Sequence, residues 1–234
     1  MAVKPQAVVD ETAAGTTIYV YETPVRVWHW VSALSITVLA ITGYFIANPL
    51  PSVGGEASEH FSMGYIRFAH FVAAYVFAIG FVARIYWAMV GNKNARQLFV
   101  LPPVFSKDWW AGMLQEMRWY LFLAKQPRKY VGHNPLALLF MFLSITVGGI
   151  FMIATGFALY GEGAMDGHWS HLLFTSWVIP LFGQSQDVHT WHHMVAWGMV
   201  WFIILHVYAA IREDIMSPQT MVSAIISGYR SFRE

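Results

Sequence analysis

The sequence predicts an all-α membrane protein, a bundle of four transmembrane helices with both termini in the cytoplasm. Three observations support this fold class: an apolar composition, four long apolar segments and a one-sided distribution of basic residues. The 234 residues are 57% hydrophobic and only 12% charged, with a mean hydropathy of +0.47. A soluble domain of this length normally carries about twice this charged fraction. We therefore interpret residues 1–234 as a single integral-membrane domain.

The composition also excludes several kinds of site. The chain has no cysteine, so it cannot hold a thiolate iron–sulfur cluster, a disulfide framework or a c-type haem. Any metal must therefore be bound by histidine or carboxylate. The net charge is +1 and the basic residues form no dense patch, so no nucleic-acid partner is expected. The N-terminal stretch lacks the apolar core of a signal peptide, which predicts that the first hydrophobic segment is retained as a span.

Four segments are apolar and long enough to cross a bilayer, which takes roughly 20 helical residues. They lie at about 30–47, 64–90, 135–160 and 191–211. The strands of a β-barrel would be shorter and would alternate between apolar and polar residues, so helices are predicted.

The basic residues predict the orientation of the spans. Of the 14 Lys and Arg residues, 13 lie in the N-terminal tail with Lys4 and Arg26, in the segment 84–129, or at the C-terminus with Arg212, Arg230 and Arg233. Only Arg67 lies on the other side. By the positive-inside rule, both termini and the central loop face the cytoplasm, which predicts a multi-pass protein of the cytoplasmic (inner) membrane.

Two further segments are apolar but do not span. Residues 108–125 are aromatic and interrupted by charges, which is typical of a helix in the headgroup region. Residues 168–184 contain a short apolar run broken by Pro180 and suit an interfacial platform for a partner. For both segments, a loop that rests on lipid is an equally good interpretation.

The fourth span carries histidines near both ends, in "HTWHHMVAWGMVWFIILHVYAAIRED". His192 and His206 are 14 residues apart, which places them about 21 Å apart along a helix and within about 40° of one face. His193 falls nearly opposite. The face argument therefore prefers His192 to His193, although the choice between neighbours stays open.

Two other histidines lie at matching depths on other spans. His70 in the second span matches His192, and His29 in the first span matches His206, which predicts two histidine pairs. Gly43, 14 residues after His29, would let a flat macrocycle pass close to the backbone.

An arginine is expected near each pair. Arg84 lies at the depth of the inner pair and Arg67 one turn from His70, so that each could neutralise haem propionates. For Arg67, snorkelling to the interface or pairing with Glu59 is the alternative.

Four histidines matched in depth favour a functional site over simple hydrogen bonding between helices. A zinc site or a proton pathway usually includes carboxylates, and the interiors of the spans contain no Asp or Glu. Apolar walls around paired imidazoles suit low-spin haem. A short sequence similarity between the first span, with "AITGYFI", and the third, with "IATGFAL", suggests an internal duplication of the chain. The third span has Phe142 where the first has His29, so it would form a wall without a ligand.

The sequence resembles the b-type cytochrome subunit of membrane-bound nickel–iron hydrogenases over nearly its whole length. The resemblance is carried by "PVRVWHW", "ITGYFIANPLPSVGGEA", "MGYIRFAHF", "RIYWAMVGN", "RWYLFLAK", "GHNPLA", "IATGFALY", "DVHTWHH" and "HVYAAIREDIMS". It implies two b haems, with His70 and His192 as axial ligands of the outer one and His29 and His206 of the inner one. It also implies a position beside the C-terminal membrane helix of the hydrogenase small subunit, which is joined to the large nickel–iron subunit. Electrons would pass through the haems to quinone.

Alternatives remain open at this point. A related cytochrome b of formate dehydrogenase or a b561-type quinol oxidoreductase would share the histidine geometry, and a histidine-based metal transporter is a remote competitor. Quinone could be served by polar residues near the cytoplasmic surface, although a solvated juxtamembrane cluster is the plainer interpretation. These residues are Tyr208, Arg212, Glu213, Asp214 and His133.

Overall fold

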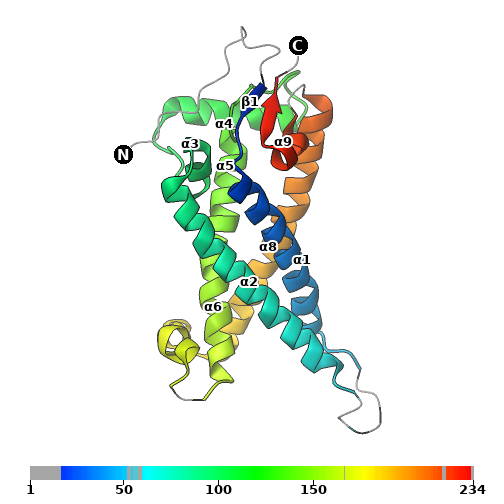
Figure 1. The fold of residues 1–234 in the computed structure, drawn as a ribbon, viewed down its shortest axis with the longest axis vertical. Coiled ribbons are helices and arrows are strands. Elements are labelled where there is room, and N and C mark those ends of the chain that lie inside the picture. The colour runs from blue at the N-terminus through cyan, green and yellow to red at the C-terminus, as the bar shows by residue number, and fades with distance from the viewer. Residues whose placement is uncertain are drawn as a thin grey trace.

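The computed structural model describes residues 17–51, 54, 56, 60–165, 167–217 and 220–232. Lys4, Glu59 and Arg233, which entered the predictions above, lie outside these residues. The four spans are α1 (Thr23–Ala47), α2 (Ser62–Val90), a third span of α5 (Pro135–Met141), η4 (Phe142–Val147) and α6 (Gly148–Glu162), and α8 (Ser185–Met216). All four are long and apolar enough to cross a membrane, which confirms the predicted bundle of four transmembrane helices (Figure 1). The chain is an integral membrane protein.

The first and fourth spans begin earlier than predicted, at Thr23 and Ser185 rather than near 30 and 191. Pro24 occupies the first turn of α1, where its missing N–H costs no hydrogen bond. Arg26 follows it, and its guanidinium donates to the carbonyl of Ile226 and to the hydroxyl of Thr23. A charged residue can therefore extend the helix because the end of the bundle provides its acceptors.

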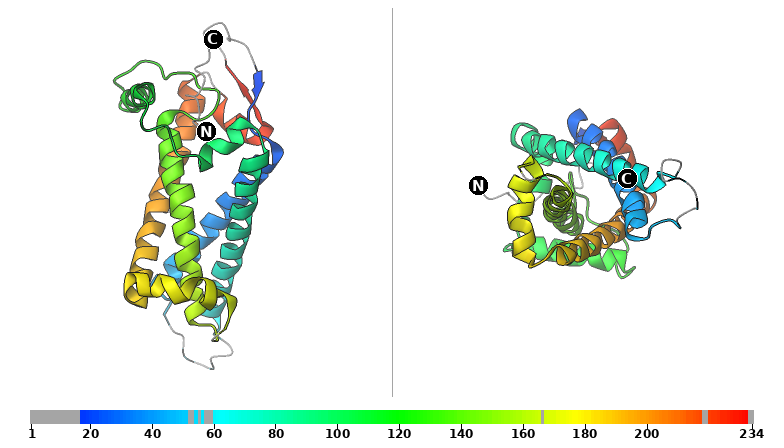
Figure 2. Two further views of the ribbon diagram at one scale, coloured as in Figure 1. Left: turned by 90° about the vertical axis from the view of Figure 1, so that its left-hand side faces the viewer. Right: turned by 90° about the horizontal axis from the view of Figure 1, so that it is seen from below.

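The spans pack as two pairs. Helix α1 lies along α2, and α6 lies along α8, with fewer contacts between the pairs. Figure 2 shows the spans running side by side along the long axis of the molecule. Large apolar side chains such as Leu34 and Ile79 are more than two-thirds exposed, at 69% and 68%, as expected for surfaces that lipid would cover.

Short elements cap one end of the bundle, which we call the basic end. Strands β1 (Thr17–Tyr19) and β2 (Tyr229–Ser231) pair antiparallel, with Ile18 opposite Arg230. Around them lie α3 (Lys93–Arg96), η3 (Gln97–Phe99), α4 (Lys107–Tyr120) and α9 (Met221–Ser227). The two described chain ends therefore meet at the same end, as an even number of spans requires. Among the described basic residues, only Arg67 lies toward the opposite end.

Residues predicted to form an interfacial helix do so in part. Helix α4 runs across the basic end of the bundle (Figures 1 and 2), but it ends at Tyr120 rather than at residue 125. Phe122 adopts a positive φ of 62°, a left-handed conformation that cannot continue the helix. The N-terminus of α4 is capped by Ser106, whose hydroxyl accepts from the N–H of Trp109.

The second predicted platform lies at the opposite end, as η5 (His171–Thr175) and α7 (Ser176–Phe182). These helices lie across the ends of the spans (Figure 2). The expected break at Pro180 was wrong, because Pro180 lies inside α7. The proline removes a single backbone donor close to the C-terminus of the helix, and the chain turns only at Gly183, where φ is 97°.

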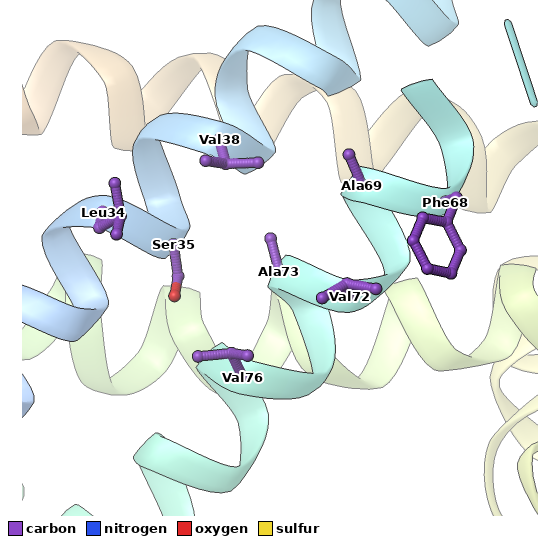
Figure 3. A pocket seen from close by; sticks show the side chains of 8 residues that line it. All are labelled: Leu34, Ser35, Val38, Phe68, Ala69, Val72, Ala73 and Val76. Atoms are coloured by element: carbon purple, nitrogen blue, oxygen red, sulfur yellow. The ribbon is translucent and has the colours of Figure 1, made fainter. Parts of the chain in front are cut away.

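An apolar groove of about 400 Å³ separates parts of α1 and α2 (Figure 3). Among the described residues, its lining is one polar side chain, Ser35, and seven apolar ones: Leu34, Val38, Phe68, Ala69, Val72, Ala73 and Val76. None of the four candidate histidines lines this groove. It is therefore not where the predicted pairs could hold an iron.

Candidate functional site

His29 of α1 and His206 of α8 face each other near the basic end, and we call them the inner pair. Their ring centres are 6.3 Å apart and the rings are inclined by 49°. A metal ion bonded at about 2 Å to one nitrogen of each ring needs ring centres roughly 6 Å apart. The ring of Phe202 stacks on His206 at 5.6 Å. The separation of the inner pair therefore fits two axial imidazoles of one iron.

Arg84, predicted to lie at the depth of the inner pair, packs against Trp28, which precedes His29 in α1. It is only 3% exposed, and its guanidinium lies 5.3 Å from the ring centres of Trp28 and Phe99. One nitrogen, Nη2, donates to the carbonyl of Ala95 at 2.6 Å. Within the described residues, Nε and Nη1 have no hydrogen-bond partner. A buried cation with two unpartnered nitrogens, Nε and Nη1, has the chemistry to hold a carboxylate such as a haem propionate.

Arg67 has a different environment from Arg84. It is exposed near the opposite end, and among the described residues it makes no hydrogen bond or ion pair. Its alternative partner, Glu59, lies outside the described residues. A role for Arg67 beside the outer pair therefore stays a prediction.

His70 of α2 and His192 of α8 form the outer pair, and they are close enough to interact electrostatically. The hydroxyl of Thr42 lies 2.9 Å from Nδ1 of His70, and the hydroxyl of Thr155 lies 2.7 Å from Nδ1 of His192. Neither threonine stood out in the sequence as a site residue. The only sequence signal that pointed to them was the similarity between "AITGYFI" and "IATGFAL", which contains both.

A glycine follows each of these threonines and faces the same imidazole. A Cβ atom on Gly43 would lie 3.4 Å from Cε1 of His70, and one on Gly156 would lie 3.3 Å from Cε1 of His192. Both distances are tight for a methyl group. The space beside Gly43 thus faces the imidazole of His70, whereas the spacing of Gly43 from His29 predicted room for a macrocycle. The third span, expected to form a wall without a ligand, contacts His192 through Thr155 and Gly156.

The structure places the neighbouring histidines of "HTWHH" differently. His193 is exposed, and its Nε2 accepts a hydrogen bond from Nε1 of Trp197, one turn along the same helix, at 3.1 Å. His192 is partly buried against α6. This arrangement favours His192 over His193 as the member of the outer pair.

A hydrogen-bonded chain of polar groups lies between the inner pair and the basic end. The hydroxyl of Tyr21 lies 3.2 Å from Nε2 of His133, and Nδ1 of His133 lies 3.0 Å from Oε1 of Gln97. Burial, reinforced by the positive charge of Arg230, lowers the pKa of His133 to about 3. His133 is therefore neutral at physiological pH and can both donate and accept a hydrogen bond.

Two buried carboxylates lie deeper in the cap. Glu116 is fully buried, and Oε1 accepts from the N–H of Arg128 at 3.2 Å. Burial, reinforced by the charge of Glu213, raises the pKa of Glu116 to about 7. Glu213 is 4% exposed and accepts from Nδ2 of Asn134 at 3.4 Å.

Arg212 is also buried in the cap. Its guanidinium donates to the carbonyls of Tyr120 and Trp119, each at 2.8 Å, and lies 4.1 Å from the ring centre of Phe122. The interpretation of a solvated juxtamembrane cluster is thus wrong for Arg212 and Glu213. Tyr208 and Asp214, in contrast, are exposed.

The donor set of the spans consists of two imidazole pairs. Among the described residues, no three His, Asp or Glu side chains gather into a group that could hold a metal ion alone. Structural zinc sites usually take four protein ligands, whereas six-coordinate haem takes two axial ones and an apolar slot. The residues present therefore fit haem.

Comparison with known proteins agrees with this chemistry. The sequence profile of a family described as "Prokaryotic cytochrome b561" matches residues 20–228. A "Probable Ni/Fe-hydrogenase B-type cytochrome subunit" of Azotobacter chroococcum is 58% identical over 219 residues, covering 94% of this chain and 90% of that protein. A protein of the same name from Cupriavidus necator is 59% identical over 216 residues, covering 92% and 88%. The corresponding hydrogenase 1 subunit of Escherichia coli K12 is 49% identical over 221 residues, covering 92% and 91%. Four apolar spans, paired histidines and a profile match over most of the sequence lead to one assignment: the chain belongs to the prokaryotic cytochrome b561 family.

Proposed function

We propose that the chain is the dihaem cytochrome b subunit of a membrane-bound nickel–iron hydrogenase and that it relays electrons to quinone. The relatives described above are named as B-type cytochrome subunits of Ni/Fe hydrogenases. Among the redox alternatives, these names favour a hydrogenase over a formate dehydrogenase or an independent quinol oxidoreductase as the partner.

The observation that carries the proposal is the facing of His29 and His206 at a ring separation of 6.3 Å. His70 and His192 form the second pair toward the opposite end. His192 and His206 lie on one helix, 14 residues apart and thus about 21 Å along its axis. Haem b bound between each pair would accept and pass on one electron at a time. The two pairs give the membrane two redox centres at different depths.

Each residue of this arrangement has a defined task. The two imidazoles of each pair would bind the iron of one haem. Through its unpartnered nitrogens Nε and Nη1, Arg84 would neutralise a propionate of the inner haem, and Arg67 would do the same near the outer pair. Gly43 leaves room beside His70. The apolar walls limit water around the centres, which influences their potentials.

The electron path begins at the opposite end of the bundle. We propose that the small subunit and its C-terminal membrane helix dock there, with the large nickel–iron subunit outside the inner membrane. Haem held by the outer pair would take up the electron, and haem held by the inner pair would pass it toward the basic end, which would face the cytoplasm. Quinone takes up two electrons and two protons near the buried groups of the cap. Glu116, with a pKa of about 7, is suited to hold one of these protons at neutral pH.

The test is the haem content of the chain, purified in detergent together with its hydrogenase. Pyridine extraction is expected to give two b haems for each cytochrome chain, and hydrogen should reduce both. Added quinone should reoxidise them. One haem in fully loaded protein would contradict the two-pair arrangement, and no haem would contradict the proposed function. Reduction by formate but not by hydrogen would show that the partner is a formate dehydrogenase.

A further inference from the structure

We propose that Thr42 and Thr155 are positioning residues that select the tautomer of the two outer histidines. Each hydroxyl accepts the Nδ1–H of an imidazole on the neighbouring helix, which leaves Nε2 without a proton and able to bind iron. The inference rests on the proposed function, because it concerns the ligands of a haem.

The first step is the bonding of the two hydroxyl protons. The hydroxyl of Thr42 donates to the carbonyl of Val38 at 2.6 Å, four residues earlier in α1. The hydroxyl of Thr155 donates in the same way to the carbonyl of Phe151 at 2.8 Å. A hydroxyl has a single proton, so each of these oxygens can take part in a further hydrogen bond only as an acceptor.

The second step follows for the imidazoles. The Thr42 oxygen lies 2.9 Å from Nδ1 of His70, and the Thr155 oxygen lies 2.7 Å from Nδ1 of His192. With the hydroxyl proton in the bond to the main-chain carbonyl, the oxygen accepts and Nδ1 carries the proton. A neutral imidazole protonated at Nδ1 has its lone pair at Nε2, the nitrogen that remains for a metal. An acceptor at the remote nitrogen also orients the ring and raises its basicity as a ligand.

The third step is that the same dipeptide occurs twice. In α1 and in α6, a threonine binds Nδ1 of the histidine while the following glycine faces Cε1 of the same ring. Thr42 and Gly43 act on His70 of α2, and Thr155 and Gly156 act on His192 of α8. The two helix pairs thus build equivalent halves of one site, although the histidines of the two halves lie on different helices.

In the described residues, the inner pair has no such threonine hydroxyl at its histidine nitrogens. Within the described residues, Nδ1 of His29 is buried and has no hydrogen-bond partner. The outer ligands are therefore the more strongly electron-donating, which stabilises ferric iron and lowers the potential of the outer haem relative to the inner one. This order favours electron flow from the outer pair to the inner pair.

The experiment is a redox titration of the purified complex carrying Thr42→Val or Thr155→Val. Valine keeps a branched shape but has no acceptor. Each variant should raise the potential of the outer haem, changing its reduction equilibrium roughly tenfold, which is about 59 mV for one electron. Thr42→Ser and Thr155→Ser keep the acceptor and should retain the wild-type potential.

Thr37→Val is the matched control. The hydroxyl of Thr37, also in α1, donates to the carbonyl of Ala33 at 2.8 Å but has no histidine partner. Its replacement should leave both haem potentials unchanged.

Each outcome decides the inference. Valine variants that keep full haem content and an unchanged potential of the outer haem would overturn the inference. A serine variant whose outer-haem potential shifts as far as that of the valine variant would also overturn it. If a valine variant loses the outer haem, the inference requires that the matching serine variant keep that haem at the wild-type potential. Loss of the outer haem from the serine variant as well would show that Thr42 and Thr155 act only through packing. Failure of the proposed function would be seen separately, as wild-type protein without haem.

Discussion

Oε1 of Glu116 accepts a hydrogen bond from the main-chain N–H of Arg128, 3.2 Å away, while Oε2 has no partner among the described residues. A fully buried carboxylate with one bond is poorly compensated when it is charged. Burial and the neighbouring Glu213 raise its pKa to about 7, while the charge of Arg128 acts against this shift. Glu116 therefore titrates close to neutral pH.

We expect Glu116→Gln to reduce the loss of stability at high pH. Between the ordinary glutamate pKa of 4.5, which the unfolded chain retains, and the pKa of about 7 in the folded protein, the folded state binds the proton more tightly. Stability is thus lost as pH rises through this window and stays low above it. Glutamine cannot ionise, so the variant should gain on the order of 1–3 kcal/mol relative to wild type between pH 5 and pH 8. Thermal unfolding of the complex in detergent at several pH values measures this difference.

The test depends on the difference in stability between wild type and Glu116→Gln, because other groups also titrate in this pH range. The pKa of His133 is lowered to about 3, so below pH 6.5 this group favours the folded state more as pH rises, which is the opposite sign. It acts equally on wild type and variant. Parallel pH profiles for the two proteins would show that Glu116 does not titrate in this range.

The two histidine pairs should be separable by substitution. His206→Ala is expected to remove the inner haem while hydrogen still reduces the outer one, and His70→Ala should block entry of electrons. Reduced-minus-oxidised spectra would then lose different components. Loss of the same component in both variants would mean that the pairing of His29 with His206 and of His70 with His192 is incorrect.

Adjacent histidines of α8 should respond differently. His193 is exposed and bonded to Trp197, so His193→Ala should leave haem content and the reduced spectrum nearly unchanged. His192→Ala removes the ring that Thr155 holds and should abolish the outer haem. The reverse result, a silent His192→Ala and a deleterious His193→Ala, would show that α8 is distorted at this point when haem is bound.

Arg84→Gln should lower the potential of the inner haem. Removal of a buried positive charge disfavours the gain of an electron nearby, and a roughly tenfold change in the reduction equilibrium corresponds to about 59 mV. Redox titration gives this value, and the inner component is identified by its absence from His206→Ala. The control is Arg96→Gln, because Arg96 is exposed at the same end and donates only to the carbonyl of Met89. An equal shift in both variants would reflect the general charge of the basic end and not the position of Arg84.

The sequence was sufficient for the four spans and for the depth of each histidine, because both follow from apolar length and helical spacing. It underestimated α1, whose first turns look too polar for lipid but use acceptors on α9. The roles of Thr42 and Thr155 were out of reach, since a threonine that bonds its own helix looks the same in sequence whether or not another helix brings a histidine to it. The burial of Glu116 likewise depends on segments far apart in the chain.

The pairing of β1 with β2 has a consequence for the biogenesis of the protein. Thr17 and Ser231 contact each other across a sequence separation of 214 residues. At a synthesis rate of about 5–20 residues per second, β1 waits roughly 10–40 s for its partner strand to be made. During that time the translocon must insert all four spans with the correct orientation, since an odd number would leave the strands on opposite sides of the bilayer. Strands β1 and β2 can therefore pair only after all four spans have been inserted.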